Sequence, residues 1–162
     1  KDDVNGIHWI PLMAHIKEGC YNSDFTKYHH LNIRDDITLT DLDAIQFRMM
    51  KDGTERIRAI EYKGTYEAHR PMQTAVLNRF KDYFKALNKM ASKTKFELFM
   101  ITADFRENAF NGDYFLKDDE AIVFNFIENK TKKINENNLI SFLNFNREWE
   151  NLGHNDKKPI DG

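Results

Sequence analysis

The spacing of hydrophobic and polar residues over positions 7–64 predicts a helix followed by a β-hairpin. Residues 7–21 carry apolar side chains at a rough helical spacing and end near a glycine, which predicts a helix. The polar stretch 22–36 predicts at most a short strand near 30–33. Residues 37–50 are rich in β-branched and apolar residues that alternate in part, and residues 55–64 repeat this character. The Asp-Gly pair between the two runs is a turn signal, so they predict a hairpin.

The remainder of the chain predicts a helix between strands and a closing helix. Pro71 suits the first turn of a helix, and an apolar stripe follows at helical spacing as far as Met90. Residues 95–105 predict an apolar strand, and a helix between two strands implies a crossover with parallel pairing. Residues 120–134 predict another strand or a hairpin, and residues 135–150 predict the closing helix. The order α-β-β-α-β-β-α predicts an α/β fold with a mixed central sheet flanked by helices.

Composition indicates one globular domain. The chain has 162 residues, of which 41% are apolar and 31% are charged, enough to bury a core. We expect a single domain over residues 1–150 and a C-terminal tail over residues 151–162. No apolar run approaches the roughly 18 residues that span a membrane, and no signal peptide is recognisable.

The single cysteine and the net charge exclude some classes of structural site and partner. The single cysteine, Cys20, excludes an internal disulfide and a cysteine-based zinc site, and it suits a reducing compartment. We therefore expect an intracellular location, in the cytoplasm or with the nucleoid. The net charge of −2 gives no global basic signature for nucleic acid. Binding to a polyanion would need a local basic patch or metal ions.

The predicted hairpin brings two acids and a lysine to one place. Directly opposed residues in a hairpin have numbers with a constant sum, and a loop centred on residues 52–53 gives a sum near 104 to 106. Asp43 then lies across from Glu61, and Asp41 lies across from Lys63, with Cβ atoms about 5 Å apart. A two-residue turn would give an odd sum and place Asp43 and Glu61 on opposite faces. A shared site therefore predicts a three-residue loop or a bulge in this hairpin.

This combination of side chains suits chemistry on phosphate. Two neighbouring carboxylates resist ionisation together unless a cation lies between them. Mg²⁺ takes a few carboxylate oxygens, completes its octahedron with waters, and binds substrate phosphate. A lysine beside such an ion can orient or deprotonate the attacking water. The hairpin is therefore a candidate site for Mg²⁺ or Mn²⁺.

The same residues match a known family pattern. Asp43 followed by IEYK at 60–63 resembles the Asp…Glu-x-Lys pattern of the PD-(D/E)XK nuclease superfamily. The stretch TDLDAIQF at 40–47 and Gln73 in the first turn of the next helix strengthen the resemblance, which covers roughly residues 7–105. It implies a restriction-endonuclease-like fold with an α-β-β-β-α-β core. It also implies a Mg²⁺- or Mn²⁺-dependent deoxyribonuclease that hydrolyses phosphodiester bonds in DNA with a metal-activated water.

The resemblance also implies roles for individual residues. Asp43 and Glu61 would be metal ligands, joined by the backbone carbonyl of Tyr62. Lys63 would position the nucleophilic water. Gln73 would support the site or the scissile phosphate.

Further positions extend this implied site. Glu18 matches a position where some members place another acidic metal ligand, and His15, one helical turn away, competes for that role as in the exonuclease domains of recombination helicases. Those domains usually carry a tyrosine four residues after the glutamine, where this chain has Leu77, which argues against that branch. Arg70 and His69 are candidate phosphate contacts.

A second Glu-x-Lys sequence, IENK at 127–130, is rejected on geometry. Its upstream acid Asp119 and Glu128 bracket a single predicted strand, and nine residues at about 3.3 Å each separate them by roughly 30 Å. No metal ion bridges that distance.

Two other function classes compete with the nuclease. The first is a catalytically silent nucleic-acid- or protein-binding module of the same fold, and the second is a metal-binding structural domain. The intact set of Asp43, Glu61 and Lys63 favours the enzyme, because a silent relative has no need of these residues. A homodimer is a further hypothesis, since a small nuclease that cuts both strands of a duplex often uses two active sites.

Overall fold

The computed structural model describes a small part of one unit and most of a second. The chain divides into two compact units, residues 1–41 and residues 42–162. The described residues are 24, 28, 31–34, 42–67 and 71–153. The predicted helix over residues 7–21 lies outside them.

The described residues of the first unit correct one prediction. Leu31 and Asn32 are helical, as are Asp24 and Tyr28, so the short strand predicted near residues 30–33 is wrong. The Asn32 side-chain amide donates to the carbonyl of Tyr28, four residues earlier, at 2.9 Å.

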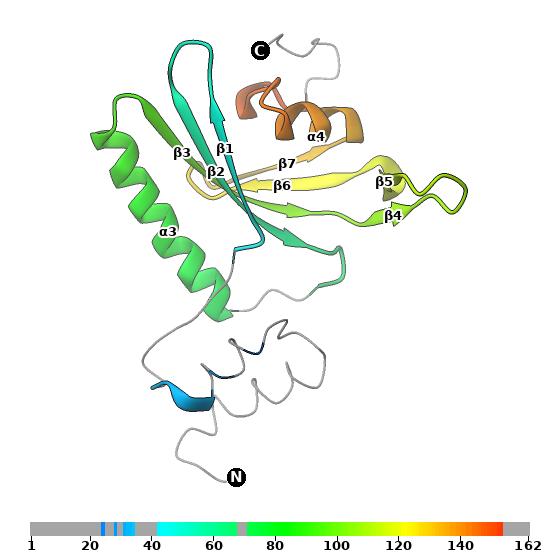
Figure 1. Ribbon diagram of the computed structural model, residues 1–162, viewed down its shortest axis with the longest axis horizontal. Helices are drawn as coiled ribbons and strands as arrows, with labels where there is room; N and C mark the ends of the chain where they lie inside the picture. The colour runs from blue at the N-terminus through cyan, green and yellow to red at the C-terminus, as the bar shows by residue number, and fades with distance from the viewer. Residues whose placement is uncertain (1–23, 25–27, 29–30, 35–41, 68–70, 154–162) are drawn as a thin grey trace. The chain divides into compact units, whose positions relative to one another are not determined.

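The second unit is a mixed α/β structure (Figure 1). None of the helices in the described ranges is both long enough and apolar enough to cross a membrane. The elements occur in the order β1 (Ala44–Met49), β2 (Glu55–Lys63), α3 (Pro71–Met90), β3 (Thr94–Thr102), β4 (Phe105–Glu107), β5 (Tyr114–Leu116), the 3₁₀ turn η1 (Lys117–Asp119), β6 (Ala121–Asn125), β7 (Lys130–Ile134), α4 (Glu136–Leu143) and the 3₁₀ turn η2 (Trp149–Asn151).

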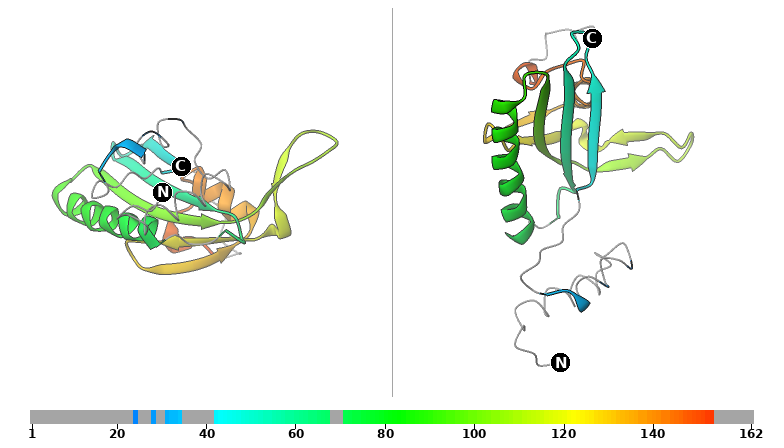
Figure 2. Two further views of the ribbon diagram at one scale, coloured as in Figure 1. Left: turned by 90° about the horizontal axis from the view of Figure 1, so that it is seen from below. Right: turned by 60° about the vertical axis from the view of Figure 1, so that its left-hand side comes forward.

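Five of these strands form one sheet in the order β1-β2-β3-β6-β7. β2 and β3 are parallel and connected through α3, whereas the other neighbouring pairs are antiparallel. The predicted crossover is therefore confirmed, and so is the hairpin over residues 120–134, which contains β6 and β7. β4 and β5 form a separate two-stranded ribbon that projects from the sheet (Figures 1 and 2).

The predicted start of the first hairpin strand and the predicted end of the closing helix are wrong, and the ribbon between β3 and β6 was not predicted. In the described residues the first hairpin strand begins only at Ala44, after a bend at Asp43. The closing helix ends at Leu143 because Phe145 adopts a left-handed backbone conformation with φ of 58°, which breaks the helical path. The β4–β5 ribbon was not predicted, because its two strands have only three residues each.

Each face of the sheet is covered by one helix. α3 packs against one face, where it buries Leu77 and half-buries Phe80 against Ala59 and Leu98. α4 packs against the other face, where Phe142 meets the larger core. Odd-numbered β2 positions therefore point towards α3 and even-numbered ones towards α4, since side chains alternate along a strand.

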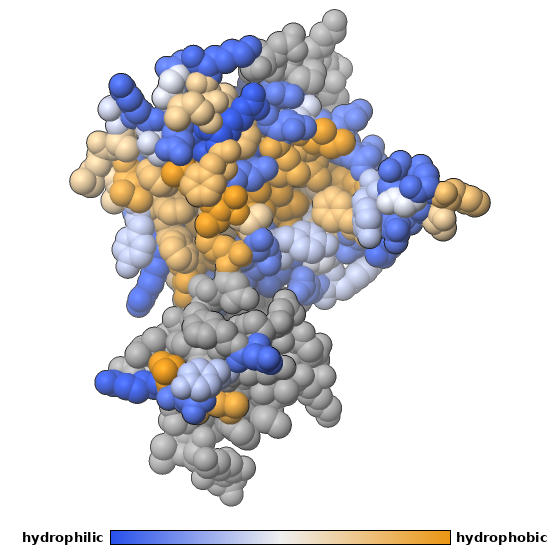
Figure 3. Space-filling view, in the orientation of Figure 1, coloured by the Kyte–Doolittle hydropathy of each residue, from blue (hydrophilic) through white to orange (hydrophobic). Residues whose placement is uncertain are grey.

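Edge strand β1 presents different chemistry to the two sides. Gln46 and Arg48 donate to the carbonyls of Leu143 and Asn144 at the end of α4. The alternate positions, which point the other way, leave large apolar side chains exposed: Ile45, Phe47 and Met49. Apolar residues accordingly gather over the middle of the face shown in Figure 3.

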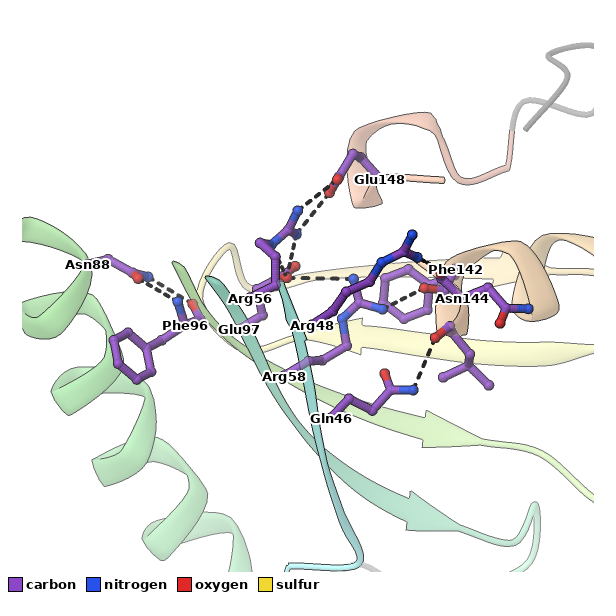
Figure 4. A network of polar contacts seen from close by, with 11 residues as sticks. Gln46, Arg48, Arg56, Arg58, Asn88, Phe96, Glu97, Phe142, Asn144 and Glu148 are labelled. Carbon is purple, nitrogen blue, oxygen red and sulfur yellow. Dashed lines mark hydrogen bonds and ion pairs between the residues drawn. The ribbon is translucent and has the colours of Figure 1, made fainter. Parts of the chain in front are cut away.

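A charged network joins β2, β3 and the segment that follows α4 (Figure 4). Arg56 donates to Glu97 and to Glu148, the latter at 2.7 and 2.9 Å. Arg58 is fully buried, donates to the Phe142 carbonyl at 2.6 Å, and lies with its guanidinium 3.9 Å from the centre of that ring. Burial lowers the pKa of Arg58 to about 10, so the guanidinium stays charged at neutral pH. These charges therefore help to fix α4 on the sheet.

Candidate active site

The register of the first hairpin places Asp43 next to Glu61. Ala44 pairs with Ile60, a constant sum of 104 that holds along the whole ladder. Asp43 directly precedes this ladder, and its carboxylate accepts a hydrogen bond from the backbone N–H of Tyr62, the residue after Glu61.

The turn explains this register. The amide of Met50 donates to the Thr54 carbonyl at 2.8 Å, and the amide of Gly53 donates back to Met50 at 3.0 Å. Gly53 has φ of 82°, a left-handed conformation that glycine adopts without steric cost. The loop between the paired residues therefore has three residues, 51–53, and the predicted irregularity is confirmed.

Glu61 and Lys63 form a buried ion pair on the α3 side of β2. Glu61 is 3% exposed and Lys63 is 5% exposed. The Lys63 Nζ lies 3.8 Å from Glu61 Oε1. Both follow Ala59 at alternate positions, so they continue the face that carries the α3 core. The strand end therefore enters the protein interior with a carboxylate and an amine on one side.

Gln73, in the first turn of α3, contacts this pair. Its side-chain amide donates to Glu61 Oε1. The helix begins at Pro71, and Gln73 lies four residues before Leu77, on the face of the helix that packs on the sheet. Three of the predicted site residues, Glu61, Lys63 and Gln73, are thus brought together.

Asp43 lies at the exposed margin of this group. Its Oδ2 accepts a hydrogen bond from the backbone N–H of Tyr62 at 2.7 Å. The carboxylate thereby continues the β1–β2 hydrogen bonding beyond the last paired residues. Within the described ranges no three His, Cys, Asp or Glu side chains are grouped so that they could hold a metal ion. The described acids of the predicted site are therefore Asp43 and Glu61.

Tyr62 points to the opposite face from its two neighbours. Its hydroxyl donates to the Ala103 carbonyl at 2.9 Å, and its ring lies 5.8 Å from that of Phe105. Burial raises the pKa of the hydroxyl, and the negative charges of Asp104 and Glu67 add to this effect. The side chain thus connects the end of β2 with the chain that leaves β3.

Two further acids, which were not predicted from the sequence, bind the backbone directly after Lys63. The N–H of Gly64 donates to Glu67 at 2.9 Å, and the N–H of Thr65 donates to Asp104 at 3.1 Å. Hydrogen bonds from Thr65 hold the pKa of Asp104 below its ordinary value. The position of Asp104 just after β3 could have indicated that it lies near the end of β2, because the carboxyl ends of parallel strands meet at one edge of a sheet.

Five further residues were predicted at or beside this site. Positions 15, 18, 41, 69 and 70 lie outside the described residues, so the predictions for His15, Glu18, Asp41, His69 and Arg70 concern a part of the chain that the structure does not describe.

The rejected second motif has structural partners instead. Glu128 accepts a hydrogen bond from the indole N–H of Trp149 at 2.6 Å, and Asp119 accepts one from the N–H of Glu136 at 2.8 Å. These acids therefore hold the C-terminal segment and the start of α4.

The chain matches no family model, and no curated protein and no solved structure is detectably similar to it. The functional interpretation consequently depends on the geometry of the chain's own residues.

Proposed function

We propose that the protein is a metal-dependent nuclease that hydrolyses phosphodiester bonds in DNA. The observation that carries this proposal is the buried pair Glu61 and Lys63 at the end of β2, with Asp43 bound to the backbone N–H of Tyr62 between them. A buried ion pair is usually no more stable than well-packed apolar residues of similar size. The presence of the pair is therefore better accounted for by chemistry at this position than by stability.

The element order supports a PD-(D/E)XK core. The sequence β1-β2-α3-β3, with an antiparallel hairpin followed by a crossover helix and a parallel strand, is the order expected for the β-β-α-β part of that core. We propose that the second unit has this restriction-endonuclease-like arrangement.

The donor atoms suit Mg²⁺ or Mn²⁺. Asp43 and Glu61 offer carboxylate oxygens and Tyr62 a backbone carbonyl, all of the hard type that Mg²⁺ prefers. Mg²⁺ is often held by one or two carboxylates together with waters and substrate phosphate, so two acids are enough. When bound, such an ion lowers the pKa of its water and offsets the phosphate charge.

Each residue of the candidate site would then have a separate role. Asp43 and Glu61 would hold the ion at the end of the hairpin. Gln73 orients the Glu61 carboxylate by donating to Oε1. Lys63, beside Glu61, would donate to the attacking water and fix its direction. Burial of the pair strengthens these interactions, because the surroundings are less polar than water.

DNA cleavage tests this proposal directly. Supercoiled plasmid and single-stranded circular DNA would be incubated with Mg²⁺, Mn²⁺ or EDTA, beside Lys63→Ala and the surface control Lys133→Ala. We expect metal-dependent cutting by the wild type and the control, and none by Lys63→Ala. Metal-independent cutting, or equal cutting by all three proteins, would overturn the proposed chemistry.

A homodimer, an intracellular location and roles for Glu18, His69 and Arg70 stay predictions.

A catalytically silent binding module is the second candidate. It is favoured by the burial of Glu61, which is 3% exposed, and by the hydrogen bond that Asp43 accepts from the N–H of Tyr62. Calorimetry with Mn²⁺ separates the two. DNA binding without any heat of metal binding would favour the silent module, whereas metal binding that is lost in Glu61→Gln would favour the enzyme.

A further inference from the structure

The two flanks of α3 carry different chemistry. The helix faces the sheet along Leu77, Phe80 and Phe84. On one side of this line, helical periodicity places a row of lysines four residues apart, which spans two turns or about 12 Å. The row consists of Lys81, Lys85 and Lys89. The opposite flank carries apolar side chains: Val76, Tyr83, Leu87 and Met90.

Positive charge is concentrated on this helix. α3 has four basic side chains and one acid, Asp82, and therefore a net charge of +3. The whole chain carries −2, so the remaining residues together carry −5. Lys85 and Lys89 are exposed, and neither belongs to an ion pair found among the described residues. The row is thus a local basic surface on a protein that lacks a general one.

The lysine row begins close to the candidate active site. Gln73, which contacts Glu61, is in the first turn of the same helix. Lys81 is eight residues further on and Lys89 sixteen, so the row lies about 12 to 24 Å along the helix axis from Gln73. A rigid helix therefore connects the proposed site of cleavage to the basic surface.

We propose that the lysine row Lys81, Lys85 and Lys89 holds the phosphate backbone of the nucleic acid as it leaves the candidate active site. This inference rests on the proposed function, and it adds the location of the bound substrate on the protein surface. Lysine ammonium groups bind phosphates as flexible point charges and read no base sequence. The row therefore contributes affinity and direction to binding, and its contribution falls as salt concentration rises.

Salt-dependent binding of the full chain provides the test. A fluorescein-labelled DNA duplex would be titrated by anisotropy in EDTA, which prevents metal-dependent cleavage, at NaCl concentrations between about 50 and 300 mM. The test variant is Lys81→Gln/Lys85→Gln/Lys89→Gln. The matched control, Lys51→Gln/Lys117→Gln/Lys130→Gln, removes the same charge from other elements. Circular dichroism would verify that both variants fold.

The outcomes separate the inference from the proposed function. We expect the test variant to lose about tenfold or more in affinity at 0.15 M NaCl, and the slope of log K against log salt to become less steep by about 2 to 3. The control should keep most of the wild-type affinity. Equal losses in both variants would overturn the lysine row, while metal-dependent cleavage that needs Lys63 would leave the nuclease intact. Absence of any DNA binding and cleavage would overturn both.

An acidic protein surface is the competing occupant of the row. Labelled polyglutamate serves as the probe under the same conditions. Tighter binding of polyglutamate than of DNA, lost in the test variant, would overturn the assignment to nucleic acid.

Discussion

The buried pair of Glu61 and Lys63 gives a prediction about stability that is independent of any enzyme assay. Replacing Lys63 with methionine keeps most of the side-chain volume and removes the charge. The Glu61 carboxylate then stays buried without its positive neighbour. We expect a large loss in the free energy of unfolding at pH 7.

The size of this loss follows from distance and burial. Two unit charges 3.8 Å apart attract each other by about 4 kcal/mol at an effective dielectric constant near 20. Breaking a buried pair by removing one partner typically costs about 3–5 kcal/mol. Because Gln73 continues to donate to Glu61, we expect Lys63→Met to lose about 3 kcal/mol.

A surface pair provides the matched control. Lys133 and Glu120 lie only 2.7 Å apart, but their side chains are 67% and 42% exposed. Exposed pairs contribute about 0–1 kcal/mol, so Lys133→Met should change stability by that amount despite the shorter distance. Urea unfolding followed by circular dichroism measures both variants.

The double variant Glu61→Leu/Lys63→Met completes the cycle. Removal of both charges relieves the burial cost, and the Gln73 amide loses its acceptor, so the variant should unfold within about 1 kcal/mol of the wild type. If Lys63→Met and Lys133→Met cost the same, or if the double variant is as unstable as Lys63→Met, the reasoning that burial sets the strength of this pair is wrong.

Three further predictions concern the rest of the second unit. Glu97→Ala leaves the buried Arg58 without its nearest carboxylate and should destabilise the protein by about 3–5 kcal/mol in urea. Hydrogen bonding to Arg56 lowers the pKa of Glu148 below its ordinary value. The ionised carboxylate therefore stabilises the fold above the ordinary pKa, and this contribution is lost as the pH falls. In Glu148→Gln, the free energy of unfolding should accordingly decrease less between neutral and acidic pH than in the wild type. Phe110 is fully exposed, so Phe110→Ser should change the melting temperature little, and a clear drop would show that the ribbon is packed.

The fold was predictable where local sequence signals agree with tertiary contacts. The hairpin turn could be located from Asp52 and Gly53, because glycine alone adopts the required backbone conformation without strain. The start of α3 followed from Pro71, and the apolar stripe behind it predicted the face that packs on the sheet. Parallel pairing of β2 and β3 followed from the helix between them.

Other features depend on long-range contacts that no local pattern reveals. The last turn of α4 is held in part by side chains far away in the sequence, since Gln46 and Arg58 donate to the carbonyls of Leu143 and Phe142. Glu97 resembles an ordinary polar position in a strand, yet it is buried because two arginines of β2 point at it. The spacing of Glu61 and Lys63 predicted that they share a face, but not that both are buried.

Two sets of charges on β2 can be told apart by what they hold in place. On the α4 side, Arg56 and Arg58 bind Glu148 and the carbonyl of Phe142, so they attach the C-terminal segment to the sheet. On the α3 side the helix is already held by an apolar core, and holding it does not require a carboxylate and an amine. Burial of Glu61 and Lys63 therefore adds a cost that the architecture does not need. The catalytic role proposed above would account for this cost, and it is this asymmetry between the two faces that favours the proposal of a catalytic site on the α3 side.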